Sequence, residues 1–314
     1  MRSIFYILFL LSLLSCSSYQ EKTTIPFLYD GYILMPCTIN GIKSNFIFDT
    51  GADGLGIDSS FYSKNLITNY PKSTELTLNG ATGNKQTIRQ ITDKVIFFIE
   101  KMNFKSDYTI VGDFKPVFNN EMSGVIGWNF FKDYIIQINY VNKTMDFVRN
   151  NEYIDNNYDS IPLILENGFI YVDMKIVINN KLILQGKYIL DTGYGGSVIL
   201  TSTVSDDNKF DSIIKNKIPF SSKKSAIGGG VSGFCFRADS IKLGNHIIPV
   251  PVIEYSSNKY GLLANRGGCI GIIGNRILEK FDVIFDFKNL VLYIKPNTNF
   301  HNKIDSIRYN IKTL

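Results

Sequence analysis

The chain has 314 residues, which is long enough for one large domain or for two or three small ones. Hydrophobic residues make up 45% and charged residues 19%, a composition that excludes intrinsic disorder and a multi-span membrane protein. The net charge is +5 with no concentrated basic face, so nucleic acid is not an expected partner. The 23 Phe and 18 Tyr, with abundant Ile and Val, favour a β-rich fold.

The N-terminus is expected to be a targeting signal. Residues 4–14 form an almost wholly apolar run after a short positive start, too short to span a bilayer but suited to a signal-peptide core. The run ends in Leu-Leu-Ser-Cys, which resembles the bacterial lipobox, and this implies that Cys16 is lipidated and becomes the mature N-terminus. An ordinary secretory signal is the alternative. A lipid-anchored, exported protein at the bacterial cell envelope, facing the periplasm or the cell surface, is therefore expected.

Three cysteines remain after Cys16. An odd number cannot all pair within the chain, so Cys37, Cys235 and Cys269 do not form a disulfide scaffold. A bridge between Cys235 and Cys269 and three buried thiols remain alternatives.

One pattern occurs twice along the rest of the chain. The sequence Phe-Asp-Thr-Gly at residues 48–51 recurs as Leu-Asp-Thr-Gly at residues 190–193, at an offset of 191 − 49 = 142. The sequence Val-Ile-Gly at residues 125–127 recurs as Ile-Ile-Gly at residues 272–274, at an offset of 274 − 127 = 147. Two copies are too few for a solenoid, so the sequence predicts a duplicated, two-lobed protein.

The segments around these motifs repeat as well. Each half is predicted to run as strand, turn, strand, Asp-Thr-Gly, loop, β-hairpin, strands, apolar-apolar-Gly, short helix and hairpin, with turn signals at residues 40–41 and 179–180. The expected organisation is a signal peptide at 1–15, a polar tether at 16–27, an N-terminal lobe at 28–150, a linker at 151–160, a C-terminal lobe at 161–297 and a tail at 298–314.

The paired Asp-Thr-Gly motifs resemble those of the aspartic protease superfamily. The resemblance covers nearly all of residues 28–297: the two copies in one chain are similar to the pepsin-like enzymes, and Asp-Thr-Gly-Ala-Asp at 49–53 matches the retropepsin signature. The nearest resemblance is to bacterial, retropepsin-like aspartyl protease lipoproteins. It implies an all-β, two-lobed acid-protease fold with an extended peptide or protein substrate between the lobes. A lone Asp-Thr-Gly would be weak evidence for this family. Here two copies occur, each directly after an apolar strand, so the motif and its predicted local structure agree.

The residue chemistry points to the same reaction. Two carboxyls that share one proton can activate water and protonate the leaving nitrogen, so Asp49 and Asp191 are the expected catalytic pair. This chemistry needs no metal and no other cofactor, in keeping with a chain that has only 2 His. The resemblance implies that Thr50 and Thr192 hydrogen-bond between the lobes. It also implies that Gly51 and Gly193 allow tight turns and point N–H groups at the carboxylates.

The sequence departs from the pepsin-like pattern after each Asp-Thr-Gly. Pepsin-like enzymes usually place Ser or Thr there, whereas this chain has Ala52 and Tyr194. Losing those hydrogen bonds removes a contribution that favours ionisation, so we expect raised pKa values for the pair and optimal activity at mildly acidic to neutral pH. Because the segments after the two motifs differ, an asymmetric cleft is expected.

Two glycine-rich hairpin tips are candidates for the flaps that cover the substrate in this family. The candidate flap residues are Gly80, Ala81, Thr82 and Gly83 in the first half and Gly228, Gly229 and Gly230 in the second. Plain hairpin turns are the alternative. A pairing of Asp53 with Arg276 is a further possibility by analogy with retropepsins, with a solvated surface pair as its alternative.

Three functions remain open from the sequence. The leading one is a membrane-anchored aspartic endopeptidase, and the main rival is a non-catalytic peptide-binding lipoprotein on the same fold. The third is a protein whose lobes swap between chains. Because the linker is short, a monomer with an intramolecular dyad is favoured by effective concentration.

Overall fold

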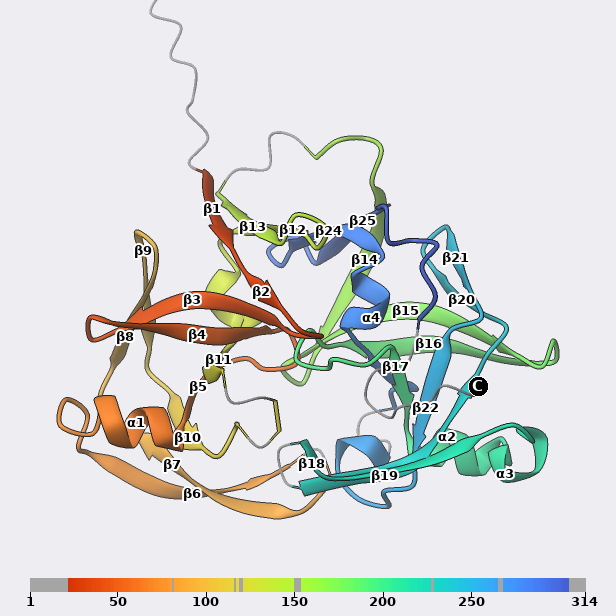
Figure 1. Ribbon diagram of the computed structural model, residues 1–314, viewed down its shortest axis with the longest axis horizontal. Coiled ribbons are helices and arrows are strands. Elements are labelled where there is room, and N and C mark those ends of the chain that lie inside the picture. Colours follow the sequence, from red (N-terminus) through yellow and green to blue (C-terminus); the bar gives the residue numbers. More distant parts are fainter. Residues whose placement is uncertain are drawn as a thin grey trace, which may run out of the picture.

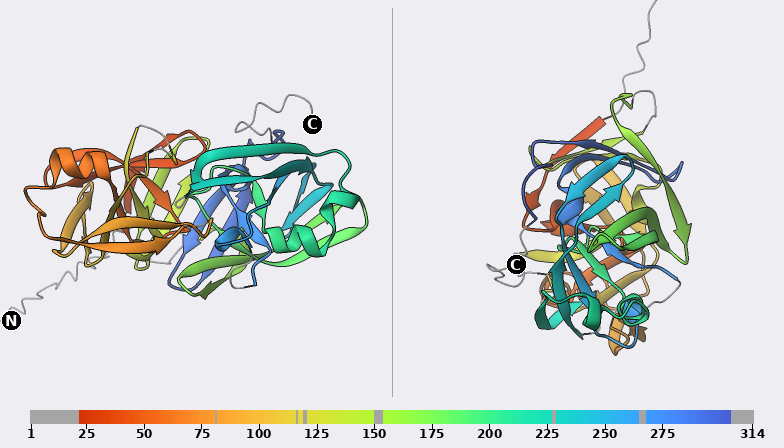
Figure 2. Two further views of the ribbon diagram at one scale, coloured as in Figure 1. Left: turned by 90° about the horizontal axis from the view of Figure 1, so that it is seen from below. Right: turned by 90° about the vertical axis from the view of Figure 1, so that its right-hand side faces the viewer.

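The computed structural model describes residues 22–80, 82–115, 117–118, 121–149, 154–226, 229–264 and 268–304. Within these residues the fold is mostly β, with short α- and 3₁₀-helices at the ends of strands. The predicted all-β, two-lobed fold is confirmed: the two halves of the chain lie side by side along the longest axis (Figures 1 and 2).

The first half forms its own sheet around the strand that leads to Asp49. The strand order is β6-β7-β10-β5-β11-β4-β3-β8-β9, with β2 on β3. The bounds are β2 Leu28–Tyr29, β3 Ile33–Ile39, β4 Ile42–Asp49, β5 Leu55–Asp58, β6 Ser73–Asn79, β7 Lys85–Ile91, β8 Val95–Ile99, β9 Met102–Ser106, β10 Thr109–Gly112 and β11 Met122–Gly127, with helices α1 Ser59–Asn65 and η1 Trp128–Phe131.

The second half repeats this plan around the strand that leads to Asp191. The path runs β15-β16-β23-β17-β22-β19-β18, with β20 and β21 paired beside β15. The bounds are β15 Phe169–Ile178, β16 Leu182–Leu190, β17 Val198–Leu200, β18 Ile218–Ala226, β19 Gly229–Arg237, β20 Ser240–Leu243, β21 His246–Pro249, β22 Val252–Ser256 and β23 Gly271–Ile273, with helices α2 Ser202–Asp207, α3 Phe210–Ile213, η2 Leu262–Ala264 and α4 Asn275–Leu278.

A third set of strands joins the halves. Its order is β1-β13-β12-β24-β25-β14, with β1 Lys22–Pro26, β12 Ile135–Asn139, β13 Thr144–Val148, β14 Asp159–Glu166, β24 Phe281–Asp286 and β25 Val291–Pro296. At its centre β12 pairs antiparallel with β24, and Gln137 faces Ile284. Since 284 − 137 = 147 is the repeat offset, Gln137 and Ile284 are each other's counterparts, and the pseudo-two-fold axis passes through this pair.

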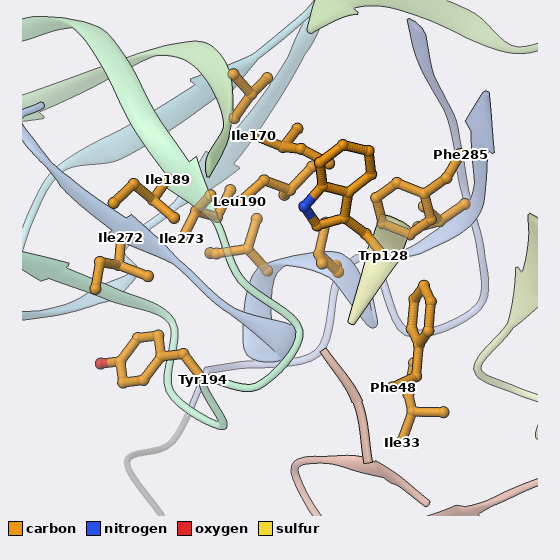
Figure 3. Packing of buried hydrophobic residues seen from close by; sticks show 14 of the residues in the cluster. Ile33, Phe48, Trp128, Ile170, Ile189, Leu190, Tyr194, Ile272, Ile273 and Phe285 are labelled. Carbon is orange, nitrogen blue, oxygen red and sulfur yellow. The ribbon is translucent and has the colours of Figure 1, made fainter. Parts of the chain in front are cut away.

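The hydrophobic core runs continuously from one half into the other. Phe48 lies 5.5 Å from the ring of Phe131 in its own half and 6.1 Å from the ring of Phe285 in the other. Phe48, Leu190 and Ile273 are each 0% exposed and belong to the same buried cluster (Figure 3). Because these side chains are fully buried, the contact between the halves is part of the folded core. The two active loops, which are the loops that follow Asp49 and Asp191, therefore rest on one apolar cluster.

The tether predicted for residues 16–27 is wrong over its described part. Lys22–Pro26 forms β1, which pairs with β13, and Ile25 is 0% exposed. In a β-strand alternate side chains point to the same face, so Ile25 can enter the core while its polar neighbours face solvent. The backbone of β1 then pairs with the edge of β13. The signal peptide and Cys16 lie outside the described residues. Among the residues that the structure does describe, no helix has the length and apolar character needed to cross a membrane.

The start of the predicted tail, for which the sequence suggested no role, packs against the second half. Lys280 is 3% exposed and its Nζ donates to the carbonyls of Asn299 and Phe300, at 3.3 and 3.2 Å, and to that of Asn302. A lysine whose ammonium is surrounded by backbone carbonyls is a satisfied buried charge, so it ties this segment to the end of α4.

The three described cysteines are buried thiols. Cys37, Cys235 and Cys269 form no disulfide with one another. Burial raises the pKa of the Cys235 thiol to about 11, so at neutral pH it stays protonated and unreactive. The bridge between Cys235 and Cys269, one of the two alternatives left open by the sequence, is therefore not formed.

Candidate active site

The two aspartates occupy equivalent positions at the ends of buried strands. β4 ends at Asp49 and pairs in parallel with β11, so that Gly127 lies beside Asp49. β16 pairs in parallel with β23, and the Asp191 N–H donates to the Ile273 carbonyl at 3.0 Å. The two apolar-apolar-Gly segments, at residues 125–127 and 272–274, thus lie directly beside the strands that lead to the two aspartates.

The threonines of the two motifs interlock across the pseudo-two-fold axis. The Thr50 N–H donates to Thr192 Oγ1 at 2.9 Å, and the Thr192 N–H donates to Thr50 Oγ1 at 3.0 Å. Each hydroxyl then donates at 2.7 Å to a carbonyl of the opposite half, Thr50 to Leu190 and Thr192 to Phe48. Both threonines are 0% exposed, so these four bonds fix the two loops against each other without competition from water.

Replacing Thr50 by valine, which keeps its shape, is expected to lower the free energy of unfolding by about 2–3 kcal/mol. The substitution leaves the Leu190 carbonyl and the Thr192 N–H buried without partners. Thr92 donates to the Lys72 carbonyl at an exposed position, so Thr92→Val is the control and should change stability by about 0.5 kcal/mol or less. Equal effects of the two substitutions on urea denaturation would contradict the prediction.

The glycines of the two motifs lie against the carboxyl groups of the opposite halves. A Cβ added at Gly51 would stand 2.6 Å from Asp191 Cγ, and one added at Gly193 would stand 2.5 Å from Asp49 Cγ. Neither glycine has a positive φ, so the tight turn given by sequence reasoning is not what requires glycine here. The requirement is space, because each loop leaves room for the aspartate of the other half.

The carboxyls form a hydrogen-bonded pair with raised pKa values. The Gly51 N–H donates to Asp49 Oδ1 at 2.7 Å, and the two side chains hydrogen-bond to each other. Burial raises the pKa of Asp49, and burial together with the negative charge of Asp49 raises the pKa of Asp191 well above its usual range. Asp191 Oδ1 is buried and receives no hydrogen bond from any described group. Because burial and the like charge disfavour ionisation of both carboxyls at once, the pair can share one proton.

The loops that follow the two motifs differ by one residue. Asp49 is six residues before the first residue of β5, Leu55, whereas Asp191 is seven residues before that of β17, Val198. Tyr194 is 8% exposed, and its ring fills the space above Gly196, where a Cβ would stand 2.3 Å from it. The two loops are therefore asymmetric, although the aspartates and threonines are symmetric.

The two hairpins expected to cover the site have tips that meet (Figure 1). β6 pairs with β7 and β18 with β19. A Cβ added at Gly83 would stand 2.5 Å from Tyr260 Cβ, and one added at Gly229 would stand 3.2 Å from Asn84 Nδ2. Thr82, at the first tip, is 4% exposed. Gly80 and Gly230 flank these contacts, whereas Ala81 and Gly228 lie outside the described residues.

Replacing Gly83 by alanine is expected to lower kcat/KM for peptide cleavage roughly tenfold. The effect is smaller than the roughly hundredfold loss that a displacement of the reacting groups by about 1 Å can cause, because Gly83 lies in a hairpin tip and not beside the carboxyls. The new Cβ would clash with Tyr260, and φ at Gly83 is +84°, a region that alanine avoids. Gly41 has φ +77° with nothing within 4 Å, so Gly41→Ala isolates the backbone strain. If both variants cleave a peptide equally well, the contact between the first hairpin tip and Tyr260 does not matter.

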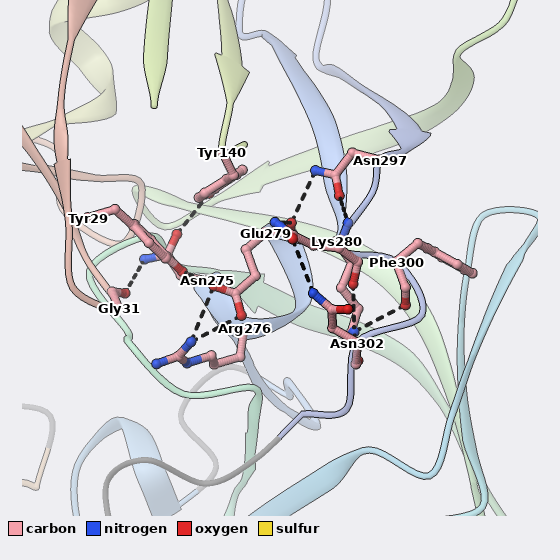
Figure 4. A network of polar contacts seen from close by, with 11 residues as sticks. Tyr29, Gly31, Tyr140, Asn275, Arg276, Glu279, Lys280, Asn297, Phe300 and Asn302 are labelled. Atoms are coloured by element: carbon pink, nitrogen blue, oxygen red, sulfur yellow. Dashed lines mark hydrogen bonds and ion pairs between the residues drawn. The ribbon is translucent and has the colours of Figure 1, made fainter. Parts of the chain in front are cut away.

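The retropepsin analogy suggested a pair between Asp53 and Arg276, but Arg276 contacts a different carboxylate. Its Nη1 contacts Glu279 Oε1 at 3.1 Å, one turn along α4, and Glu279 Oε2 accepts a hydrogen bond of 2.6 Å from the Tyr29 hydroxyl (Figure 4). The i, i+3 spacing of Arg276 and Glu279 brings them together on one helix face, whereas Asp53 belongs to the other half. This spacing was visible in the sequence and was overlooked.

Two polar residues beneath the site were also missed. Asn275 is 0% exposed and donates from Nδ2 to the carbonyls of Gly31 and Thr192, at 2.9 and 2.6 Å. Tyr140 donates its hydroxyl to Asn275 Oδ1 at 2.9 Å. Only the position of Asn275, directly after the second apolar-apolar-Gly, offered a signal.

Possible metal ligands are not clustered among the described residues, which contain no group of three or more His, Cys, Asp or Glu side chains that could hold a metal ion.

Comparison with known proteins gives one family match, which lies in the first half. No curated protein matches the chain. Residues 35–130 match the family model described as aspartyl protease. This range runs from within β3 to within η1 and contains Asp49 and its partner strand β11. This part of the chain is thus similar to aspartyl proteases.

Proposed function

We propose that the protein is an aspartic endopeptidase that uses one aspartate from each half, Asp49 and Asp191. The observation that carries the proposal is the symmetric setting of the two carboxyls, each at the end of a buried strand and each facing the glycine of the other motif. The aspartyl protease match supports this chemistry for the half that contains Asp49. The reciprocal threonine bonds support its extension to the half that contains Asp191.

The carboxyl pair can supply both proton transfers of amide hydrolysis. The ionised member takes a proton from water as the water oxygen attacks the carbonyl carbon, and the protonated member donates to the carbonyl oxygen. The protonated member then donates its proton to the leaving nitrogen as the carbon–nitrogen bond breaks, and the other member takes a proton from a hydroxyl of the tetrahedral intermediate, so that the pair again holds one shared proton. Because the titration belongs to the pair, we assign the proton to neither residue.

An extended polypeptide is the proposed substrate. Between the dyad and the hairpin tips, a strand-like peptide can pair its backbone with neighbouring strands and alternate its side chains between pockets. Because the tips of β6–β7 and β18–β19 meet, they would separate when a long substrate enters.

The lipid anchor at Cys16 is part of the proposal. With β1 starting at Lys22, only residues 17–21 separate the anchor from the folded body. Six residue steps at full extension reach about 20 Å, so the body would work close to the membrane surface of the bacterial envelope.

Cleavage of a peptide library by the mature protein between about pH 3 and 8, read by mass spectrometry, tests the activity. We expect endoproteolysis with an optimum at mildly acidic to neutral pH, because burial and the neighbouring charge raise the pKa of the pair. A profile that peaks only at strongly acidic pH would contradict the pH prediction. Absence of cleavage at every pH, with retained peptide binding, would favour a non-catalytic binding lipoprotein instead.

A further inference from the structure

The residue after each apolar-apolar-Gly occupies the same backbone position in the two halves. These residues are Trp128 and Asn275, and 275 − 128 = 147 is the repeat offset. The Trp128 N–H donates to the Ala52 carbonyl and the Asn275 N–H donates to the Tyr194 carbonyl, both at 3.0 Å. The side chains that follow are unrelated in shape and chemistry, yet they start from equivalent points below the active loops.

Both side chains donate a hydrogen bond across the axis to equivalent glycines. Asn275 Nδ2 donates to the Gly31 carbonyl at 2.9 Å, and Trp128 Nε1 donates to the Gly168 carbonyl at 3.3 Å. Gly31 precedes β3 and Gly168 precedes β15, at an offset of 168 − 31 = 137. The strand pairs Leu34–Ile47 and Tyr171–Ile189 show the same offset, since 171 − 34 = 137, so the two glycines are structural counterparts.

The turns that contain these glycines touch the active loops of the opposite halves. A Cβ at Gly31 would stand 3.5 Å from the Gly195 carbonyl oxygen, and one at Gly168 would stand 3.6 Å from Asp53 Oδ2. Since 195 − 53 = 142, these contacts are also related by the offset of the dyad. Each half therefore holds a turn of the other half between its active loop and the side chain of Trp128 or Asn275.

Asn275 makes the more complete connection of the two. Its second Nδ2 bond, at 2.6 Å, reaches the carbonyl of Thr192, the residue next to Asp191, and its Oδ1 accepts from Tyr140 (Figure 4). Thr192 in turn bonds to Phe48 and Thr50 in the first half. A fully buried amide whose two N–H donors and one acceptor oxygen all form hydrogen bonds holds its partners in defined positions.

We propose that Asn275 is a positioning residue that holds the Asp191 loop against the first half, and that Trp128 does the same, with one bond, for the Asp49 loop. The proposal rests on the proposed peptidase function. Neither side chain contacts substrate; both act through the loops that carry the dyad.

Kinetics of Asn275→Ala and Trp128→Phe test the proposal. We expect Asn275→Ala to lower kcat roughly 10- to 100-fold with little change in KM and to shift the pH profile, because the distance between the carboxyls sets their shared titration. Trp128→Phe should lower kcat by roughly 3- to 10-fold, since it removes one longer bond. The control is Asn297→Ala, which removes a bond of 3.1 Å to the Glu279 carbonyl at the end of α4 without touching either loop.

The outcomes separate this proposal from the proposed function. If wild type cleaves peptides and Asn275→Ala keeps its kcat and pH profile, or if Asn297→Ala changes them equally, positioning is overturned. If wild type cleaves nothing, NMR titration of ¹³C-labelled aspartate carboxyls still tests whether Asn275 positions the Asp191 loop. A shift of the Asp49–Asp191 titration in Asn275→Ala, and not in Asn297→Ala, supports positioning while the peptidase proposal fails; no shift overturns positioning.

Discussion

Replacing either Asp49 or Asp191 by asparagine is expected to lower kcat/KM about a thousandfold or more while making the folded protein more stable at neutral pH. The loss of activity follows because asparagine neither accepts a proton from water nor donates one to the substrate carbonyl. The fold should survive, since asparagine keeps the shape and an oxygen that can accept the 2.7 Å bond from the Gly51 N–H to position 49. Steady-state kinetics on a peptide cleaved by wild type measure the first effect.

The gain in stability follows from the raised pKa of the pair. The folded state keeps a proton that the unfolded chain releases near pH 4, so stability falls as pH rises from about 4 through the raised pKa and stays lower above it. Asparagine carries no such proton. The variants should therefore match wild type below about pH 4 and exceed it increasingly towards neutral pH, as urea denaturation at several pH values would show.

Asp58 provides the control for a buried carboxyl with a different role. It is 2% exposed, and its oxygens accept hydrogen bonds from the backbone N–H groups of Ser60, Phe114 and Lys115, at 3.0, 3.1 and 3.0 Å. Asp58→Asn should lower stability, because an amide group accepts these bonds less well than a carboxylate does. Destabilisation of the dyad variants at neutral pH, or retention of full activity by either one, would contradict the assignment of Asp49 and Asp191.

Local patterns in the sequence were sufficient to predict the two β-strands that lead to Asp49 and Asp191. The apolar runs before residues 49 and 191 form β4 and β16, because alternating and continuous apolar residues determine which faces of a strand are buried. The repeat offset of 147 predicted the equivalence of η1 and α4, and it also relates Gln137 to Ile284, which face each other in the middle of β12 and β24. The reciprocal bonds of Thr50 and Thr192 were implied by the family resemblance alone.

Features that depend on contacts between distant segments could not be predicted. β1 consists of mostly polar residues, and it becomes a strand because β13 offers it an edge and the core accepts Ile25. Asn275 looked like an ordinary polar residue until folding brought Tyr140 and Gly31, 135 and 244 residues away, to its amide. The contact of the first hairpin tip, at Gly83, with Tyr260 likewise follows from how the two halves pack, which no local pattern records.

Replacing Gly51 or Gly193 by alanine is expected to lower kcat/KM about a hundredfold or more, with a loss of stability of about 1–3 kcal/mol. A methyl group at Gly51 would stand 2.6 Å from Asp191 Cγ, and one at Gly193 would stand 2.5 Å from Asp49 Cγ. Real carbon atoms do not approach so closely, so the opposite carboxyl must move and the hydrogen bond of the pair is stretched. Kinetics and thermal unfolding of both variants measure the two effects.

Gly54 offers a matched control within the same loop as Gly51. Its φ is not positive, and a Cβ there would meet nothing closer than 3.8 Å, so Gly54→Ala should keep both activity and stability near those of wild type. Because Gly51 faces Asp191 and Gly193 faces Asp49, the two active-loop variants should be impaired alike even though their halves differ in sequence. A fully active Gly193→Ala would mean that Asp49 does not depend on the second half, and the dyad would then not be a symmetric pair.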